Sequence, residues 1–479
     1  MDFDSDFTLT INGQGICTAR EMDVVNPATG LAFARAPLAE EAELDAAVIA
    51  AQAAFPAWKA LGWHRRRALL LAAAKALEPH TDALAQLFMR EQGRPLAMAR
   101  GEIDLGIHWI KAVARQSLED ETVEDSPART VFVRHEPLGV VAGIVPWNFP
   151  FLLAIWKIAP TLISGNTMVL KPSPFTPLCA LKLAEIWRDI LPAGVFNVIN
   201  GENELGPMMT AHSGFAKISF TGSTATGKRV MEAAARDLKR VTLELGGNDA
   251  AIVLPDVDVK AVAQKLFFGA FYNSAQICIA TKRLYVHDAI YDAMRDELAR
   301  LVLANAVGDG STPGVMFGPV QNKPQYDRVN SLIADARAQG LTMIEGPAPR
   351  GQSGYFIPLT LVDNPPEDAA VVQEEAFGPV LPLLRYSDID DVIARANASE
   401  YGLAGAVWTG DVARGIEIAN RLETGTVWIN DNLQNAPHIP FAGAKQSGLG
   451  VENGLDGLRE FTWRRTVFAP KPIERHEGA

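Results

Sequence analysis

The stretch GVVAGIVPWNFPFLLAIWKIAPTLISGNTMVL, residues 139–170, determines the fold class that we expect. Gly139–Val145 and Thr167–Leu170 are short apolar runs typical of buried strands, and Phe151–Ile163 between them has the length and composition of a buried helix. A strand, a helix and a second strand in this order predict a βαβ unit with parallel strands.

The same alternation continues beyond this stretch. The next predicted segments are a helix at Leu178–Ile190, strands at Val195–Ile199 and Lys217–Phe220, a helix at Thr224–Arg236 and a strand at Val241–Leu245. Repeated units of this kind build a parallel, doubly wound sheet, so we predict an α/β protein with a Rossmann-type sheet. Such sheets commonly bind nucleotides, but the fold alone does not establish the ligand.

The flanking regions differ in pattern. The first third is rich in helices, and Ala/Leu-rich sequence predicts helices at Ala46–Lys59 and Arg66–Leu87. A second α/β region runs over residues 247–440, with candidate strands at Ala250–Leu254, Leu284–Val286, Ala404–Val407 and Val427–Ile429. The length is therefore divided among more than one domain.

Composition and charge exclude several classes of protein. Hydrophobic residues make up 48% of the 479 residues and charged residues 21%, which is enough for large cores. The net charge is −12 and we find no basic run longer than Arg65–Arg67, so we expect no nucleic acid partner. The acidic N-terminus lacks the features of a secretory signal, and no apolar run of about 18 residues occurs. We expect a cytoplasmic protein without a membrane span.

Of the three cysteines, Cys278 has the setting of a nucleophile. Cys17 and Cys179 are distant from it in sequence, which indicates neither a metal cluster nor a CxxC redox pair, and we predict no metal site. Cys278 ends the segment Phe-Tyr-Asn-Ser-Ala-Gln-Ile-Cys, residues 271–278, among small and amide side chains. Taken alone, this cysteine fits a buried structural thiol better than a nucleophile.

Four further blocks change that balance. They are Pro-Trp-Asn-Phe-Pro at 146–150, Thr-Leu-Glu-Leu-Gly-Gly-Asn at 242–248, Glu-Glu-Ala-Phe-Gly-Pro-Val at 374–380 and Phe-x-Gly-x-Lys-x-Ser-Gly-x-Gly at 441–450. With the Cys278 segment, and in this order, they make the chain resemble the NAD(P)-dependent aldehyde dehydrogenase superfamily, in its hydrolytic rather than its coenzyme A-acylating form. The resemblance extends from about Ala46 to about Phe468.

The resemblance implies a covalent mechanism with three catalytic residues. A free carbonyl has no hydride to give until a nucleophile adds to it, and the family uses the cysteine at the position of Cys278. Asn148 matches the donor that, with the backbone N–H of Cys278, stabilises the resulting alkoxide, although it also suits a simple turn between two prolines. Glu244 matches the general base, whose pKa burial would raise. Ala275 stands where the family usually has glycine, a small departure next to the thiol.

Two further residues resemble a proton relay that supports the base in many members. These are Lys157 and Glu452. A surface lysine and a surface glutamate are an equally good interpretation of both positions.

The resemblance also implies NAD as the cofactor, with NADP as a second candidate. Lys171 corresponds to the lysine that holds the adenosine ribose, and Phe220–Ser223 precedes a helix whose N-terminus suits the pyrophosphate. Pro174 stands where many NAD-preferring relatives have a glutamate, which lowers the barrier to NADP. The cofactor-binding residues implied are Pro146, Trp147, Lys171, Ser173, Gly222, Ser223, Leu245, Gly246, Glu375 and Phe377.

An aldehyde is the substrate that the resemblance implies. The residues expected to line its tunnel are Phe149, Leu153, Trp156, Ile277, Ile279 and Phe441. Because all of them are apolar, we expect an aliphatic or aromatic aldehyde rather than a small charged semialdehyde. His438 and Gln434 lie in a loop that often contacts substrate tails, so a polar tail is also compatible with the sequence.

The family's domain organisation is expected here as well. It implies a cofactor-binding domain from residues 1–120 and 138–246, a catalytic domain from 247–440, and an oligomerisation extension with C-terminal tail from 121–137 and 441–479. That extension would join subunits into a homodimer or homotetramer.

Two rival functions deserve comparison. Gly222–Lys228 resembles the P-loop of an NTPase, but Arg229 occupies the place where a P-loop needs Ser or Thr for magnesium. A coenzyme A-acylating enzyme of the same family generally lacks the glutamate at the position of Glu244, so the presence of Glu244 favours hydrolysis.

Overall fold

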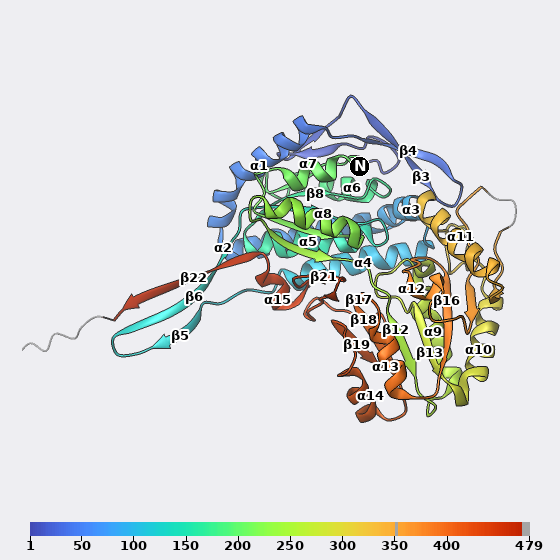
Figure 1. Ribbon diagram of the computed structural model, residues 1–479. Helices are drawn as coiled ribbons and strands as arrows, with labels where there is room; N and C mark the ends of the chain where they lie inside the picture. Colours follow the sequence, from blue (N-terminus) through green and yellow to red (C-terminus); the bar gives the residue numbers. More distant parts are fainter. Residues whose placement is uncertain (350–352, 472–479) are drawn as a thin grey trace, which may run out of the picture.

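The computed structural model describes residues 1–349 and 353–471. It contains two α/β units, each built around its own sheet, and a long three-stranded ribbon that projects from them (Figure 1). The predicted α/β class is confirmed.

The first sheet has eight strands in the order β2-β1-β9-β8-β7-β10-β11-β21. The five central strands, from β9 to β11, are parallel, while β1, β2 and β21 pair antiparallel at the edges. The strand bounds are β1 Leu9–Ile11, β2 Gln14–Ile16, β7 Val140–Ile144, β8 Thr167–Lys171, β9 Phe196–Val198, β10 Lys217–Thr221, β11 Arg240–Glu244 and β21 Gly448–Leu449.

Helices cover both faces of this sheet, as a doubly wound fold requires. On one face α1, α7 and α8 contact the strands, and on the other α5 and α6 do so, backed by α2, α3 and α4. Every residue of α5 is buried, because it lies between the sheet and this outer layer. The bounds are α1 Glu41–Ala60, α2 Gly62–Leu77, α3 Thr81–Gln92, α4 Leu96–Val113, α5 Pro150–Ser164, α6 Leu178–Trp187, α7 Leu205–Ala211 and α8 Thr224–Ala235.

Two details of the N-terminal third differ from the prediction. The single helix predicted at Arg66–Leu87 is two helices, separated by a 3-10 turn at Glu78–His80, because Pro79 has no N–H to donate into the preceding turn. The strands β1 and β2 were not predicted. Their tight turn is Asn12-Gly13, with φ of 52° and 74°, and this dipeptide is a recognised hairpin signal.

The second sheet has seven strands in the order β14-β15-β16-β13-β12-β18-β19. All neighbours are parallel except β14 and β15. The four strands predicted in this region are present, and β14, β15 and β16 are additions. The bounds are β12 Ala250–Val253, β13 Arg283–His287, β14 Thr342–Glu345, β15 Thr360–Asp363, β16 Val380–Tyr386, β18 Ala404–Trp408 and β19 Thr426–Ile429.

This sheet separates two apolar cores. Ala251 and Val253 of β12 pack into one core with α9 and α10, while Ala250 and Ile252 pack into the other with α11 to α14. The alternation follows from the period of two along a strand. The helices are α9 Val259–Phe271, α10 Tyr291–Ala304, α11 Lys323–Ala338, α12 Ala370–Gln373, α13 Ile389–Asn397 and α14 Val412–Ala419.

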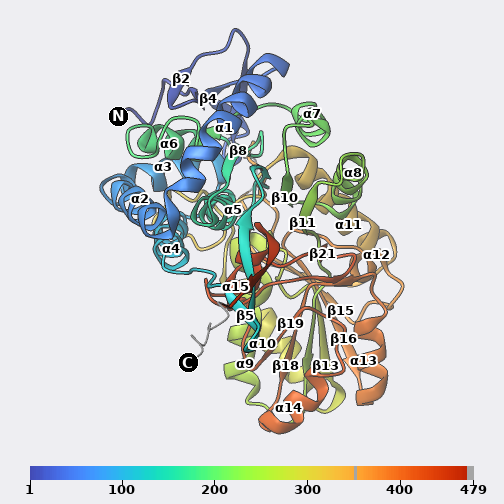
Figure 2. The ribbon, with the colours of Figure 1, turned by 90° about the vertical axis from the view of Figure 1, so that its left-hand side faces the viewer.

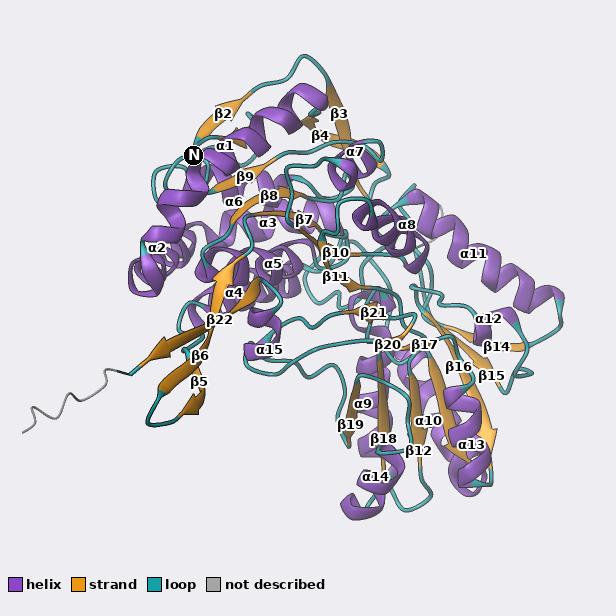
Figure 3. Ribbon diagram, turned by 60° about the vertical axis from the view of Figure 1, so that its left-hand side comes forward, coloured by secondary structure: helices purple, strands orange, loops and turns teal. Residues whose placement is uncertain are grey.

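Short elements connect the two units. β17 (Tyr401–Gly402) pairs with β20 (Ala444–Lys445), and β20 contacts β21 of the first sheet (Figure 3). The hairpin of β3 (Glu21–Asn26) and β4 (Leu31–Pro37) contacts α3. Residues 444–449, which contain β20 and β21, therefore contact both units.

The ribbon consists of β5 (Glu121–Asp125), β6 (Arg129–Pro137) and β22 (Thr462–Pro470). β6 and β22 pair antiparallel over their full length, although more than 300 residues separate them in sequence. Figure 1 shows that the ribbon extends away from both units, and Figure 2 views it from its far end, next to the short helix α15 (Gly454–Arg459). Residues 472–479 of the predicted extension lie outside the described residues.

No helix within the described residues is both long and apolar enough to span a membrane.

Candidate active site

The candidate active site is a cleft of about 370 Å³ between the two units. Its first wall comes from the loops that follow β7, β10 and β11, at the carboxyl ends of parallel strands, where such sheets bind ligands. The second wall comes from the other unit. The lining residues are Pro146, Trp147, Asn148, Leu153, Thr221, Gly222, Ser223, Thr224, Ala225, Glu244, Leu245, Gly246, Cys278, Gln325, Arg328, Glu375, Phe377 and Tyr401.

Cys278 enters this cleft from an unusual turn after α9. Asn273, Ser274 and Ala275 all have a left-handed backbone, with φ of 53°, 53° and 61°. Each such non-glycine residue costs roughly 1–2 kcal/mol, so the surrounding contacts must hold the turn. Ser274 Oγ donates to Gly318 O at 2.7 Å, and Gln276 Nε2 donates to Asn273 O at 2.9 Å. The left-handed backbone at Ala275 is the physical reason why glycine suits this position.

Glu244 is the last residue of β11 and faces Cys278. Neither of its carboxylate oxygens accepts a well-formed hydrogen bond from a described residue, and the thiol makes only a weak S–H contact with it. Burial raises the pKa of Glu244 to about 8, while the ammonium of Lys157 acts in the opposite direction. A carboxyl with such a pKa can both accept and release a proton near neutral pH.

Burial also acts on the thiol itself. Cys278 is partly exposed to the cleft, yet burial in the surrounding protein and the charge of Glu244 raise its pKa well above that of a free cysteine. In this resting arrangement the proton belongs on sulfur, so a nucleophilic thiolate needs a base beside it. Glu244 is placed to be that base.

Lys157 and Glu452 form a buried ion pair behind Glu244. The ammonium of Lys157 lies 2.8 Å from Glu452 Oε1 and donates to Ser219 Oγ at 3.1 Å. Their side chains are 1% and 3% exposed, so the interpretation of these two residues as surface side chains is wrong. Burying two charged groups costs desolvation free energy, so a contribution to the stability of the fold is a poor explanation for this buried pair.

Asn148 follows β7 and is hydrogen-bonded to the Cys278 turn through both its side chain and its backbone carbonyl. Its side-chain Nδ2 donates to Gln276 O at 3.0 Å, and its backbone carbonyl accepts from Asn273 Nδ2 at 3.2 Å and from Arg94. The amide carries a second N–H, for which no bond to a described residue is seen. That hydrogen can serve an oxygen atom bound in the cleft.

Most of the predicted cofactor residues line the cleft. Ser223 caps α8 by accepting from Thr226 N at 3.3 Å, which leaves backbone N–H groups at this helix terminus for an anion. Trp147 and Phe377 meet edge to face with ring centroids 5.4 Å apart. A side chain at Gly246 would displace the carboxylate of Glu375. The shape and donors fit a dinucleotide.

Lys171 and Ser173 lie apart from the other predicted cofactor residues. Both are buried at the carboxyl end of β8, next to β7, and neither is among the lining residues of the cleft. Lys171 Nζ donates to Pro172 O at 3.3 Å, and burial lowers its pKa to about 8.

Of the predicted substrate residues, Leu153 lines the cleft together with Cys278. Trp156 stacks on Trp109 with ring centroids 5.4 Å apart and meets Phe441 edge-on at 5.8 Å. Phe149 stacks on Tyr272 at 6.5 Å. Ile279 packs against the core of the first unit, and Ile277 is buried. Trp109 and Tyr272 were not among the predicted substrate residues; Trp109 lies in no motif, whereas Tyr272 lies in the Cys278 segment.

Several cleft residues escaped prediction. Thr221 lies within the predicted Phe220–Ser223 segment, and Thr224 and Ala225 directly follow it, so that segment was the signal for them. Gln325, Arg328 and Tyr401 come from α11 and β17, far from any recognised block, and only the fold brings them to the cleft.

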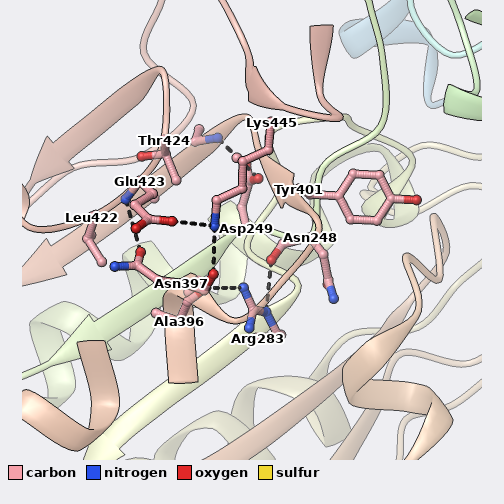
Figure 4. Close-up of a pocket in the computed structure, with 14 residues that line it drawn as sticks. Asn248, Asp249, Arg283, Ala396, Asn397, Tyr401, Leu422, Glu423, Thr424 and Lys445 are labelled. Carbon is pink, nitrogen blue, oxygen red and sulfur yellow. Dashed lines mark hydrogen bonds and ion pairs between the residues drawn. The ribbon is translucent and has the colours of Figure 1, made fainter. Parts of the chain in front are cut away.

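A second, smaller cavity lies in the second unit and has room for about one water molecule (Figure 4). Lys445 Nζ donates there to Asn397 O at 2.6 Å and pairs with Glu423 at 2.7 Å, while Arg283 donates to Asn248 O at 2.8 Å. Its side chains are engaged with one another, so this cavity is a packing feature rather than a substrate site.

Comparison with known proteins agrees over nearly the whole chain. The model of the "Aldehyde dehydrogenase family" matches residues 16–467. A Pseudomonas protein named "Probable aldehyde dehydrogenase" is 44% identical over 470 residues, which cover 98% of this chain and 96% of that protein. The NAD+ complex of an aldehyde dehydrogenase from Bacillus cereus has a TM-score of 0.95 at 35% identity, covering 98% and 97%. An NAD-dependent aldehyde dehydrogenase from Sinorhizobium meliloti also reaches 0.95, at 32% identity, covering 99% and 97%.

Proposed function

Since this chain belongs to the aldehyde dehydrogenase family, we propose that it oxidises an aldehyde to its carboxylic acid with NAD through a thioester on Cys278. The observation that carries this proposal is the convergence of the Cys278 thiol, the Glu244 carboxyl and the Asn148 amide in one cleft. These groups come from three separate parts of the chain, and each supplies a different requirement of the reaction.

The first step is addition. The Cys278 proton passes to the Glu244 carboxylate, and the thiolate forms a bond to the carbonyl carbon. The carbonyl oxygen becomes an alkoxide, which accepts hydrogen bonds from Asn148 Nδ2 and the backbone N–H of Cys278. A hydride then leaves this carbon for the acceptor that bound NAD+ would supply, and a thioester to Sγ remains.

The second step is hydrolysis. Glu244, ionised again, takes a proton from a water molecule, whose oxygen adds to the thioester carbon, and the thiolate leaves as the acid forms. Glu244 must then return its proton to solvent. The buried pair of Lys157 and Glu452, which acts on the Glu244 carboxyl electrostatically, is our candidate for the relay that carries it away.

The cofactor would occupy the part of the cleft between the start of α8 and the loop after α12. Ser223 and Gly222 at the start of α8 would hold its pyrophosphate, and Glu375 and Phe377 its nicotinamide half. Lys171 and Ser173 would meet the adenosine ribose at the end of β8. Pro174 has neither an acceptor nor a charge to exclude a 2′-phosphate, so we propose that NADP is also accepted, less well than NAD.

The substrate that we propose is an aliphatic or aromatic aldehyde. The group around Trp156 and Phe441 is apolar and aromatic, and each methylene that it buries is worth roughly 0.8 kcal/mol. Hexanal and benzaldehyde should therefore exceed acetaldehyde and a carboxylated semialdehyde in kcat/KM. The reverse order in a panel of aldehydes would contradict the apolar tunnel.

We also propose the family's assembly. Two sheets support a cofactor unit of residues 1–120 and 138–246 and a catalytic unit of residues 247–440. The projecting ribbon in 121–137 and 441–479 would join subunits into a homodimer or homotetramer, because it extends away from both units (Figure 1).

The decisive test is Cys278→Ala. This variant should lose aldehyde oxidation and still bind NAD, whereas Cys17→Ala and Cys179→Ala serve as matched controls and should keep full activity. Intact mass spectrometry of the wild-type enzyme during turnover should show an acyl adduct that is absent in Cys278→Ala. Residual activity above a trace in that variant would exclude the covalent route. A product assay with and without coenzyme A distinguishes hydrolysis from acyl transfer.

A further inference from the structure

Lys282 is a buried lysine that touches both halves of the site. It directly precedes β13, and its side chain is 6% exposed. Its ammonium donates to the backbone carbonyl of Cys278 and lies 3.4 Å from Glu375 Oε1. One side chain thus connects the turn of the nucleophile to the carboxylate on the cofactor side of the cleft.

Two buried carboxyl groups stand near the ammonium, and a third lies close to one of them. Burial raises the pKa of Asp249 to about 7 and also raises that of Glu375, and in both cases the charge of Lys282 opposes the shift. Glu244, whose pKa burial also raises, is the third. Without a cation here, deprotonating Cys278 would add a further negative charge to a cluster of acids.

The other cations near this cluster have different partners. Arg283 donates to Asn248 O and to Ala396 O, at 2.8 and 2.9 Å. Lys157 is paired with Glu452 on the far side of Glu244.

On α11, Arg328 donates to the backbone carbonyl of Glu375 at 3.1 Å and pairs with Glu374, and half of its side chain is exposed to solvent. Lys282 opposes the rise of the thiol pKa that burial and Glu244 cause, and Asp249 adds to that rise.

We propose that Lys282 is a positioning residue that holds the Cys278 turn and the Glu375 carboxylate together and supplies the positive charge that makes the thiolate accessible. The proposal rests on the function proposed above. When the thiol proton passes to Glu244, the products are a thiolate and a neutral carboxylic acid, and Lys282 takes no part in the proton transfer. Its ammonium stabilises the negative charge that appears on sulfur, and no atom or electron passes to or from Lys282.

Alkylation of Cys278 by iodoacetamide measures this effect without aldehyde or cofactor, because only the thiolate reacts. The full-length enzyme would carry Cys17→Ala, since Cys17 is exposed and would react as well. Lys282→Gln keeps a donor for the Cys278 carbonyl but removes the charge, and Lys282→Arg keeps the charge. Lys445→Gln is the matched control, since Lys445 also donates to backbone carbonyls but pairs with Glu423.

In Lys282→Gln, iodoacetamide should alkylate Cys278 about tenfold more slowly at neutral pH, and the midpoint of the alkylation rate against pH should lie about one pH unit higher. Lys282→Arg should restore most of the rate, and Lys445→Gln should match the parent enzyme. The KM for NAD should rise in Lys282→Gln, because Glu375 loses its partner, and stay unchanged in Lys445→Gln.

The proposal would be overturned if the alkylation rate of Lys282→Gln had the same pH dependence as that of the parent enzyme while the melting curve was unchanged. If the Gln variant does not fold, Lys282→Met gives the same readout and the same criterion. Aldehyde oxidation by the parent enzyme, and its loss on alkylation, tests the proposed function separately, so the two can fail independently.

Discussion

The pH dependence of thioester hydrolysis is a direct test of Glu244 as the general base. Burial raises the pKa of this carboxyl to about 8. A group with that pKa is about one-tenth ionised at pH 7 and about nine-tenths ionised at pH 9, so a step that needs the carboxylate should accelerate about tenfold over this interval. Glu244→Gln should leave a slow residual rate with no rise in this range.

The neighbouring ion pair makes the prediction sharper, because its two members act in opposite directions. Lys157 lowers the pKa of Glu244 and Glu452 raises it. Lys157→Met should therefore move the midpoint of the hydrolysis profile to higher pH, and Glu452→Gln should move it to lower pH. A shift of one pH unit corresponds to about 1.4 kcal/mol of interaction with the ionised carboxylate.

The assay is a stopped-flow measurement of NADH with one good aldehyde. A burst of one NADH per active site reports formation of the thioester, and the following linear phase reports its hydrolysis. A hydrolysis rate that is flat between pH 7 and pH 9 would refute the role of Glu244. Midpoints that move in the same direction in both variants would refute the electrostatic account of the pair.

Three further predictions concern stability and cofactor choice. Because the folded pKa of Glu244 exceeds its unfolded value, its contribution to stability is fully present below about pH 4 and is lost as pH rises through about 8. In thermal melts, Glu244→Gln should therefore be more stable than the wild type at pH 9, by up to ~5 kcal/mol, and equally stable near pH 4. Arg94→Met leaves the buried partner Glu102 unpaired and should cost about 3–5 kcal/mol in denaturant unfolding, whereas Arg100→Met, on an exposed ion pair, should cost less than about 1 kcal/mol. Discrimination between NAD and NADP in kcat/KM should stay below about a thousandfold, roughly 4 kcal/mol, and a larger ratio would show that residues other than Pro174 set the choice.

Much of the fold could be predicted from local pattern. The apolar runs around Gly139–Val145 and Thr167–Leu170 specify buried strands, and the helices between strands specify parallel pairing, because each signal depends on residues close in sequence. The boundary at Pro79 was missed for a different reason. It depends on a single absent N–H within a pattern that is otherwise helical.

The chemistry of the site was visible in part. Cys278, Glu244 and Asn148 stand in recognisable blocks, so the sequence by itself determined which residue types the reaction would have available. The sequence could not determine whether the side chains of Lys157 and Glu452 are buried or exposed, because a lysine and a glutamate suit a buried ion pair as well as a solvated surface.

Only the tertiary structure decided which charges meet. Lys282 carries no motif, and it contacts Glu375 because β13 and the loop after α12 converge on the cleft. In the same way β6 finds β22 across most of the chain, through backbone hydrogen bonds that no local sequence encodes. Periodicity and propensity are properties of neighbouring residues, whereas burial, pKa and ion pairing are set by atoms that folding brings together from distant segments. The sequence therefore determined the sheets and the reactive groups, and the folded structure determined the environment in which those groups react.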